Sequence, residues 1–320
     1  MRPSEPGAQT TIAERVTLDG IGVHSGKRAT LTIHPAGPNE GLIFTRVDLG
    51  DEIEIPARFE NVAATELCTV LGDPRHGIAT VEHVLAALRG CGIDNALIEV
   101  DGAEAPIMDG SAAPFVAAIE RAGLRRSRAP RRHIKVLKPV RVALGASTAE
   151  LLPHNGQRFE IEVDYDTPFI GRQMRVYDLD RESFRRDIAG ARTFGFMRDV
   201  ERLWAAGFAR GAGLENTVVV GQDRILNPEG LRYADEFVRH KVLDAIGDLA
   251  LAGAPLLGLY RAVRPGHKLN HAMLTALFAD PSAWALVEAA PRTHSVAPSR
   301  ELGRAELVPG LAAAALAPEV

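Results

Sequence analysis

The feature that most constrains the fold is an order of elements that occurs twice along the chain. Strand-like segments come first, and a helix, a buried strand and a second helix follow them. In the first half, this helix–strand–helix run lies at 79–92, 94–100 and 111–123. In the second half, it lies at 235–252, 255–263 and 268–279. The repeated order predicts an α+β protein of two similar domains, each a mixed sheet with helices on one face.

Residues typical of helix ends mark the two helices of the first half. Thr80 is expected to cap the first helix and Gly90 to end it. Ser111 is expected to open the second helix, with Pro114 in its first turn and Gly123 just after its end.

Changes in composition suggest the domain boundaries. We expect a first domain at 1–126, a basic linker at 127–133, a second domain at 134–294 and an Ala- and Pro-rich tail at 295–320. The segment 193–222 has no counterpart in the first half and is expected to be a small insert. The arginine-rich LRRSRAPRRHIK could instead bind an anion or a membrane surface, but charge together with proline favours a solvated linker.

Charge and hydropathy exclude several classes of protein. The net charge of −4 argues against a globally basic nucleic-acid binder, so no nucleic-acid partner is expected. No apolar run approaches the length that spans a membrane, which argues against stable membrane insertion. The first residues carry no signal-peptide pattern, and the two cysteines, Cys68 and Cys91, suit free thiols. We therefore expect a cytoplasmic protein, and a monomer.

The segment EFVRHKVLDAIGDLAL contains the sharpest candidate for a metal site. On a helix, His240 and Asp244 are four residues apart and share one face, with Asp248 one turn further on. Such a pair can bind one metal ion, although a solvated His–Asp pair has the same spacing. Apolar neighbours predict a buried helix, and a buried pair needs a partner. Gly247 is costly within a helix, which indicates that something approaches the backbone closely.

Two further histidine positions could join this site. Glu82 and His83 lie in the first turn of a helix and point in different directions, so one can ligate a metal while the other acts on a water molecule there. For Glu82 alone, charge complementarity with the helix dipole is the favoured explanation. His267 and His271 form a rival H-x-x-x-H pair. One histidine from the first half with His240 and Asp244 makes three protein ligands, the number typical of a catalytic zinc site.

Five motifs, in this order and spacing, resemble one family: TVEHVLAAL, APIMDGSAAPF, ARTFGFMRD, FVRHKVLDAIGDL and RPGHKLNHAM. From Thr11 to Trp284 the chain resembles the UDP-3-O-acyl-N-acetylglucosamine deacetylases of bacterial lipid A biosynthesis. The resemblance implies a cytosolic hydrolase with one Zn²⁺ per chain, which releases acetate and leaves the free amine on a UDP-sugar lipid precursor. It also implies two α+β domains packed together, each with a small insert and with the active site between them.

The resemblance also implies roles for individual residues. The zinc ligands fall on His83, His240 and Asp244, and the general base on Glu82. His267 corresponds to a cationic histidine held by Asp248, and Thr193 to a residue that contacts the oxyanion. Substrate-binding positions fall on Phe194, Lys241, Arg264, Asp164 and Tyr165. A lysine that the family places before the AELLP strand is missing, and Ser147 stands there.

The insert offers an apolar surface for the acyl chain. Val200, Leu203 and Trp204 share one face of a predicted short helix. The resemblance implies that Met197, Val200 and Leu214 contact the 3-O-acyl chain, whereas a small satellite core would need no ligand. Two other functions remain open at this point: a zinc amidohydrolase with another substrate, and a non-catalytic nucleotide-sugar-binding module that holds phosphate at GSAAPF.

Overall fold

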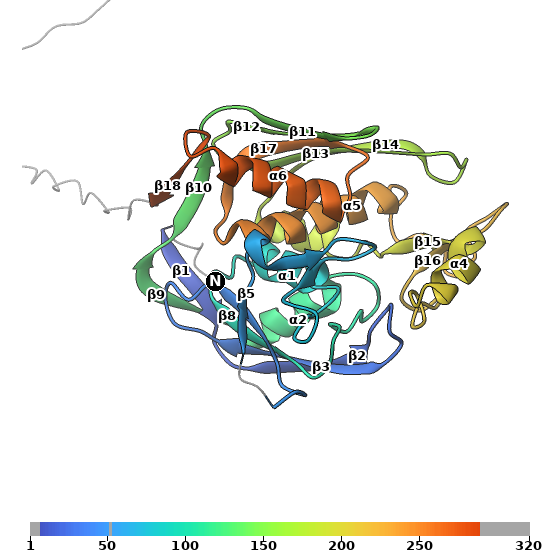
Figure 1. Cartoon of the computed structure of the whole chain (residues 1–320), viewed down its shortest axis with the longest axis horizontal. Helices are drawn as coiled ribbons and strands as arrows, with labels where there is room; N and C mark the ends of the chain where they lie inside the picture. The colour runs from blue at the N-terminus through green and yellow to red at the C-terminus, as the bar shows by residue number, and fades with distance from the viewer. Residues whose placement is uncertain (1–6, 51–52, 289–320) are drawn as a thin grey trace, which may run out of the picture.

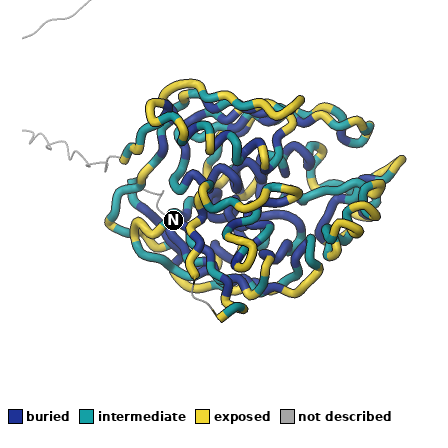
Figure 2. The backbone as a smooth tube through the Cα atoms, in the orientation of Figure 1, coloured by how far each residue is buried: buried dark blue, intermediate teal, exposed yellow. Residues whose placement is uncertain are grey.

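The computed structural model describes residues 7–50 and 53–288. Two sheets form the outer layers, and the longer helices lie between them (Figure 1). Buried residues concentrate in this inner helical layer and on the sheet faces that cover it (Figure 2). No helix of the described residues is long and apolar enough to cross a membrane.

The first half forms a five-stranded sheet with two helices on its inner face. The strands run in the order β2-β3-β8-β4-β5, and only the β4–β8 pair is parallel. The elements of this half are β1 (Ala8–Ile12), β2 (Val16–Ile21), β3 (Arg28–Pro35), β4 (Leu42–Arg46), β5 (Glu54–Pro56), the 3-10 helix η1 (Phe59–Asn61), β6 (Val62–Ala64), β7 (Val70–Leu71), α1 (Glu82–Gly90), β8 (Ala96–Val100) and α2 (Ala113–Ala122).

The second half repeats this topology. Five of its strands run in the order β11-β12-β17-β13-β14, and among these only the β13–β17 pair is parallel. Strand β10 also pairs in parallel with β17, and β18 pairs antiparallel with β10. Its elements are β10 (Arg132–Val136), β11 (Val140–Leu144), β12 (Ser147–Leu152), β13 (Gln157–Tyr165), β14 (Gly171–Asp178), α3 (Arg181–Ser183), the π-helix η2 (Phe184–Ile188), α5 (Glu236–Leu249), the 3-10 helix η4 (Ala250–Ala252), β17 (Leu256–Val263), α6 (His267–Ala279) and β18 (Trp284–Glu288). The predicted α+β duplication is confirmed.

The basic segment is a strand, where a solvated linker was expected. β9 (Leu124–Pro130) pairs antiparallel with β1, and Thr10 lies opposite Arg126. Arg131, directly after this strand, donates to the Asp94 carboxylate and to the Gly92 carbonyl. Charge and proline suggested a linker because pairing with β1, far away in the sequence, leaves no local signal.

The insert projects beyond the two sheets (Figure 1). It contains β15 (Phe194–Phe196), the 3-10 helix η3 (Met197–Asp199), α4 (Val200–Ala205) and β16 (Val218–Val220), and β15 and β16 are parallel. No residue of α4 is buried, and Trp204 is 55% exposed. A satellite core is therefore a poor description of this helix. The backbone of Arg210 and Gly211 instead donates to carbonyls of the 23–24 loop in the first half.

Helix ends follow the sequence prediction in one case and depart from it in the other. Pro114 lies at the start of α2, and Gly123 ends it with a φ of +72°. Thr80, predicted to cap α1, does not do so. Its φ is +59°, its hydroxyl donates to Glu104, and Val81 is the residue before the helix. The Glu104 carboxylate comes from a distant loop, so the sequence around Thr80 carried no sign of it.

Candidate active site

Helices α1 and α5 touch where Gly247 faces the backbone of Glu82. A Cβ atom at Gly247 would lie 2.0 Å from the Glu82 carbonyl oxygen and 3.0 Å from its Cα. No side chain fits there, so the predicted close approach to Gly247 is confirmed. The contact brings the first turn of α1, with Glu82 and His83, beside the middle turns of α5.

Three candidate ligands converge at this contact. One donor atom each from His83, His240 and Asp244 lies within 4.8 Å of the other two. The Asp244 Oδ1 atom is 3.3 Å from His240 Nε2 and 4.0 Å from His83 Nε2. All three side chains are buried, and among residues 7–50 and 53–288 neither Asp244 Oδ1 nor His83 Nδ1 has a hydrogen-bond partner. Buried polar atoms are costly to leave unpaired, so this donor set fits a bound cation.

The remaining contacts orient these ligands. His240 Nδ1 lies 3.0 Å from the Ala191 carbonyl, which makes Nδ1 the donor and leaves Nε2 for a metal. Asp244 Oδ2 accepts from Lys241 Nζ at 2.7 Å, so Oδ1 stays available. Burial and the nearby His240 lower the pKa of His83 to about 3. Burial also lowers the pKa of His240, so both imidazoles are neutral, the form that binds metal.

Glu82 is buried beside the ligands without belonging to the cluster. Its Oε2 atom accepts from the Thr69 backbone N–H at 3.0 Å. Burial raises the pKa of Glu82, the nearby His267 lowers it and the Asp248 and Asp244 carboxylates raise it, which together give a pKa of about 7. A carboxylate whose pKa lies near neutrality can both accept and return a proton.

His267 faces Glu82 from the start of α6. Its Nε2 atom lies 3.8 Å from Glu82 Oε1, and its Nδ1 lies 2.8 Å from Asp248 Oδ2. Asp248 is itself fixed, because it also accepts from the Asn270 amide at 2.7 Å and the Thr69 hydroxyl at 2.6 Å. Burial opposes protonation of His267, but Asp248 and Glu82 raise its pKa to about 10. The imidazole is therefore cationic at neutral pH.

Phe194 and Lys241 contact the ligands, and Thr193 directly precedes Phe194 in the chain. Phe194 packs edge-on against His240, with ring centroids 6.3 Å apart, and Lys241 Nζ lies 5.6 Å from the centre of the same ring. The backbone of Thr193 donates to the Gly110 carbonyl at 2.7 Å, which ties the start of the insert to the first half. Thr193 is also only two residues after Ala191, whose carbonyl orients His240.

The positions expected to contact the nucleotide also come together. Arg264 and Asp164 form an ion pair at 2.6 Å, and both side chains are exposed. Tyr165 follows Asp164 at the end of β13, and its ring lies 5.6 Å from that of Phe194. An exposed cation, a carboxylate and an aromatic ring thus lie close to the buried cluster.

Comparison with known proteins gives the family. A model of the UDP-3-O-acyl N-acetylglycosamine deacetylase family matches residues 9–279. The chain belongs to this family. The UDP-3-O-acyl-N-acetylglucosamine deacetylases of Brucella ovis and Brucella abortus are each 49% identical to it over 282 residues, which cover 88% of this chain and 99% of the relative. The enzyme of the same name from Brucella melitensis is 48% identical over the same length.

Members of this family are metalloenzymes, and the His–His–Asp cluster provides this deacetylase with a site for a metal ion. The rival metal pair is not formed, because His271 Nε2 lies 3.0 Å from the Phe59 carbonyl. The phosphate-binding alternative at GSAAPF is not supported either. The Asp109 carboxylate accepts from the backbone N–H and hydroxyl of Ser111, so a negative charge lies where phosphate would bind.

The residues expected at the acyl chain lie on the surface of the insert. Met197 is 53% exposed and Leu214 is 41% exposed, while Val200 is half-buried. Large apolar side chains left this open in a small lobe can hold an apolar ligand.

Sequence reasoning missed two residues near the site, Lys268 and Arg192. Lys268 lines a cavity of about 540 Å³ together with Ser147 and Arg264, so it brings a cation to the neighbourhood of the missing lysine. The position of Lys268 directly after His267 indicated that it lies near the site, but nothing in the sequence indicated which side chains surround it. Arg192 is fully buried and forms an ion pair with Glu236 at 2.9 Å. A buried arginine cannot be distinguished in the sequence from a surface one.

Proposed function

We propose that the chain carries out its family's reaction with a single zinc ion held by His83, His240 and Asp244. Family membership makes the chain a hydrolase that removes the N-acetyl group of UDP-3-O-acyl-N-acetylglucosamine in lipid A biosynthesis. The convergence of the three buried donor atoms within 4.8 Å is the observation that carries the metal proposal. Two imidazoles and one carboxylate, with a further position open, are the donor set typical of catalytic zinc.

When bound, zinc would polarise the acetamide carbonyl and make a water molecule more acidic. Glu82, whose pKa of about 7 suits the task, takes the proton of the attacking water. The Thr193 hydroxyl donates to the oxyanion that develops on the carbonyl. Lys241 stays paired with Asp244, and its positive charge lowers the pKa of that carboxyl group, which keeps the ligand ionised.

His267 is proposed to protonate the amine as it leaves. Its raised pKa keeps the proton in place at neutral pH, and the Asp248 contact fixes the ring with Nε2 turned toward Glu82. The amine nitrogen therefore receives its proton from His267 Nε2. Glu82 then passes the proton taken from water to His267, whose Nε2 lies 3.8 Å from Glu82 Oε1, and both groups regain their starting states. Acetate and the free amino sugar are the products.

The test separates metal binding from proton transfer. Asp244→Ala should lose bound zinc and nearly all acetate release from the UDP-sugar substrate. Glu82→Gln should keep the zinc content and the substrate affinity but lose kcat by about 10²–10⁴-fold. Glu14→Gln makes the same change at an exposed carboxylate on the surface and is the matched control. Unchanged zinc in Asp244→Ala, or unchanged kcat in Glu82→Gln, would contradict these roles.

We also propose that the insert holds the 3-O-acyl chain and that Arg264, Asp164 and Tyr165 contact the UDP group. The exposed apolar side chains of the insert support the first part, since each buried methylene adds about 0.8 kcal/mol. Removing the acyl chain should then lower kcat/KM by at least about 10³-fold. Val200→Trp should penalise long chains more than short ones at normal zinc content. Equal losses for all chain lengths would refute the insert's role.

We further propose a monomeric, cytoplasmic enzyme whose two domains divide at Arg131, between β9 and β10. The two buried free cysteines, Cys68 and Cys91, and a nucleotide-linked substrate support the compartment. Light scattering during size-exclusion chromatography would measure the mass, and limited proteolysis would locate the division. A dimer at micromolar concentration, or first cleavage within a sheet, would contradict this paragraph.

A further inference from the structure

A second cavity, of about 490 Å³, lies at the junction of the two halves. Its wall combines residues of the first half near Leu42 and Arg58 with residues of β10, β18 and α6. No residue assigned to the reaction lines it. Helix α1 begins at the reaction centre with Glu82 and reaches this cavity about 10 Å further along, at Arg89. Helix α6 reaches it about 16 Å beyond its first residue, at Phe278.

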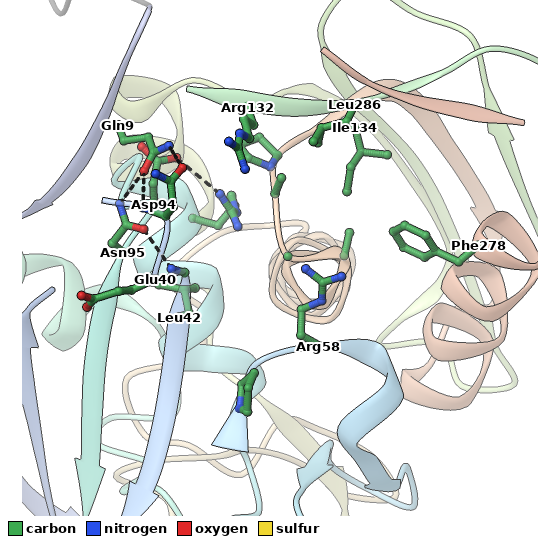
Figure 3. Close-up of a pocket in the computed structure, with 18 of the residues that line it drawn as sticks. Gln9, Glu40, Leu42, Arg58, Asp94, Asn95, Arg132, Ile134, Phe278 and Leu286 are labelled. Carbon is green, nitrogen blue, oxygen red and sulfur yellow. Dashed lines mark hydrogen bonds and ion pairs between the residues drawn. The ribbon is translucent and has the colours of Figure 1, made fainter. Parts of the chain in front are cut away.

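Three arginines face this cavity: Arg58, Arg89 and Arg132. Arg132 and Arg58 lie on opposite sides of it (Figure 3). The nearest carboxylate oxygens are 3.7, 3.9 and 3.5 Å from the three guanidinium groups, respectively. These distances exceed those of ordinary N–H···O hydrogen bonds, and within the described ranges none of the three side chains donates one. The guanidinium N–H groups of these three arginines are therefore available to a ligand in the cavity.

Arg89 is the most deeply buried of the three arginines, so an unpaired charge there is the most costly. It is 6% exposed, and its Nε atom makes no hydrogen bond to any residue that the structure describes. Burial lowers the pKa of Arg89 to about 10, although Asp94 opposes this. The Asp94 carboxylate is already shared, because it accepts from the Thr10 backbone at 2.7 Å and from Arg131 at 2.9 Å. The indole N–H of Trp284, which lines the same cavity, is a second buried donor that has no partner in the described part of the chain.

The other polar groups of the cavity are satisfied. The amides of Gln9, Asn39 and Asn95 bond to one another at 2.9–3.0 Å. Glu40, which with Asp94 supplies the carboxylates of the lining, accepts from the Gly37 backbone at 2.8 Å. A ligand would therefore be recognised through the guanidinium and indole donors, and a group that accepts hydrogen bonds and carries negative charge suits them best.

Apolar side chains complete the lining. Ile134, Leu286 and Phe278 lie around the upper and α6 sides of the cavity (Figure 3). Gly253 has a φ of +86°, and a Cβ atom there would lie 2.3 Å from Arg58 Nη1. The absence of a side chain at Gly253 thus leaves the space that the Arg58 guanidinium occupies at the cavity.

We propose that this cavity is a binding site for a small amphipathic anion, separate from the reaction centre. Its carboxylate or phosphate group would accept from Arg58, Arg89 and Arg132. Its compact apolar body, such as an aromatic ring, would lie against Phe278 and Trp284. The volume of about 490 Å³ is in the range of small-molecule sites.

The two tryptophans of the chain allow a site-specific test. Trp284 lines this cavity and Trp204 lies in the insert, so Trp204→Phe leaves Trp284 as the only indole. Phenyl phosphate and benzoate should each change the emission of Trp284 in a saturable way and should compete with each other. Their relative affinities show whether a phosphate or a carboxylate is preferred. Benzyl alcohol, which has the ring without the charge, should bind at least tenfold more weakly.

Variants then assign the binding to the arginines. Arg58→Gln combined with Arg132→Gln should raise the Kd for phenyl phosphate at least tenfold. Both side chains are exposed, so folding should be unaffected. Arg125→Gln combined with Arg128→Gln makes the same change of net charge outside the cavity and should leave the Kd within twofold. The absence of a saturable signal, equal binding of benzyl alcohol, or equal Kd values in the two double variants would overturn the proposal.

Discussion

Gly247→Ala tests the contact on which the whole site depends. On an isolated helix, alanine in place of glycine stabilises by about 1 kcal/mol. Here the new Cβ atom would lie 2.0 Å from the Glu82 carbonyl oxygen, 2.8 Å from its carbon and 3.0 Å from its Cα. All three obstacles are backbone atoms, so no side-chain rotation can relieve the overlap. To reach an ordinary contact of 3.4 Å, α1 and α5 must separate by about 1.4 Å.

The separation should change both stability and metal binding. Overpacking in a core costs about 1–3 kcal/mol, and the gain in helix propensity of about 1 kcal/mol offsets part of this cost, so a net loss of up to roughly 2 kcal/mol is expected. His83 moves with α1, whereas His240 and Asp244 move with α5. Metal–ligand distances tolerate only about 0.2 Å, so zinc affinity should fall at least about tenfold.

Urea unfolding in the presence of EDTA would measure the free energy of unfolding, and competition with a chromogenic chelator would measure zinc affinity. Gly156→Ala is the matched control, because its Cβ atom would meet its nearest neighbour at 3.5 Å, an ordinary contact. If Gly247→Ala were about 1 kcal/mol more stable than the parent and bound zinc equally well, the argument from the helix contact would be refuted.

Three further predictions concern charged groups. The folded pKa of His267 is about 10 against an ordinary 6.5, so its contribution to stability is complete below pH 6.5 and is lost as the pH rises toward 10. Urea titrations of the metal-free protein should show this fall in the parent but not in His267→Gln, and equal slopes would contradict the assignment. Arg192→Met should cost about 3–5 kcal/mol of unfolding free energy by stranding the Glu236 carboxylate. The double variant with Glu236→Leu should recover much of that loss, and no recovery would argue against the pair. Lys268→Ala should raise KM for the UDP-sugar about tenfold or more at unchanged zinc content, and Ser147→Lys in that background should restore it. An unchanged KM would place Lys268 outside the substrate site.

The sequence determined the elements and their order, because these depend on local spacing. The apolar period placed α1, α5 and α6 within a few residues of their observed bounds, and the repeated order of elements predicted two sheets of the same topology. The four-residue spacing of His240 and Asp244 sufficed to propose a shared ligand face, since one helical turn fixes that geometry.

Contacts between distant segments were decided only by the tertiary structure. Pairing with β1 makes a strand of the basic segment, and a hydrogen bond to Glu104 accompanies Thr80 in a conformation that helix capping does not use. The same holds for the site. Burial and neighbours from other elements set the pKa of Glu82 near 7 and that of His267 near 10, and neither effect is a property of the local sequence. The sequence supplies the ligand side chains, but the contact of α1 with α5 at Gly247 brings His83 to His240 and Asp244. Only the folded chain can place two helix backbones this close together.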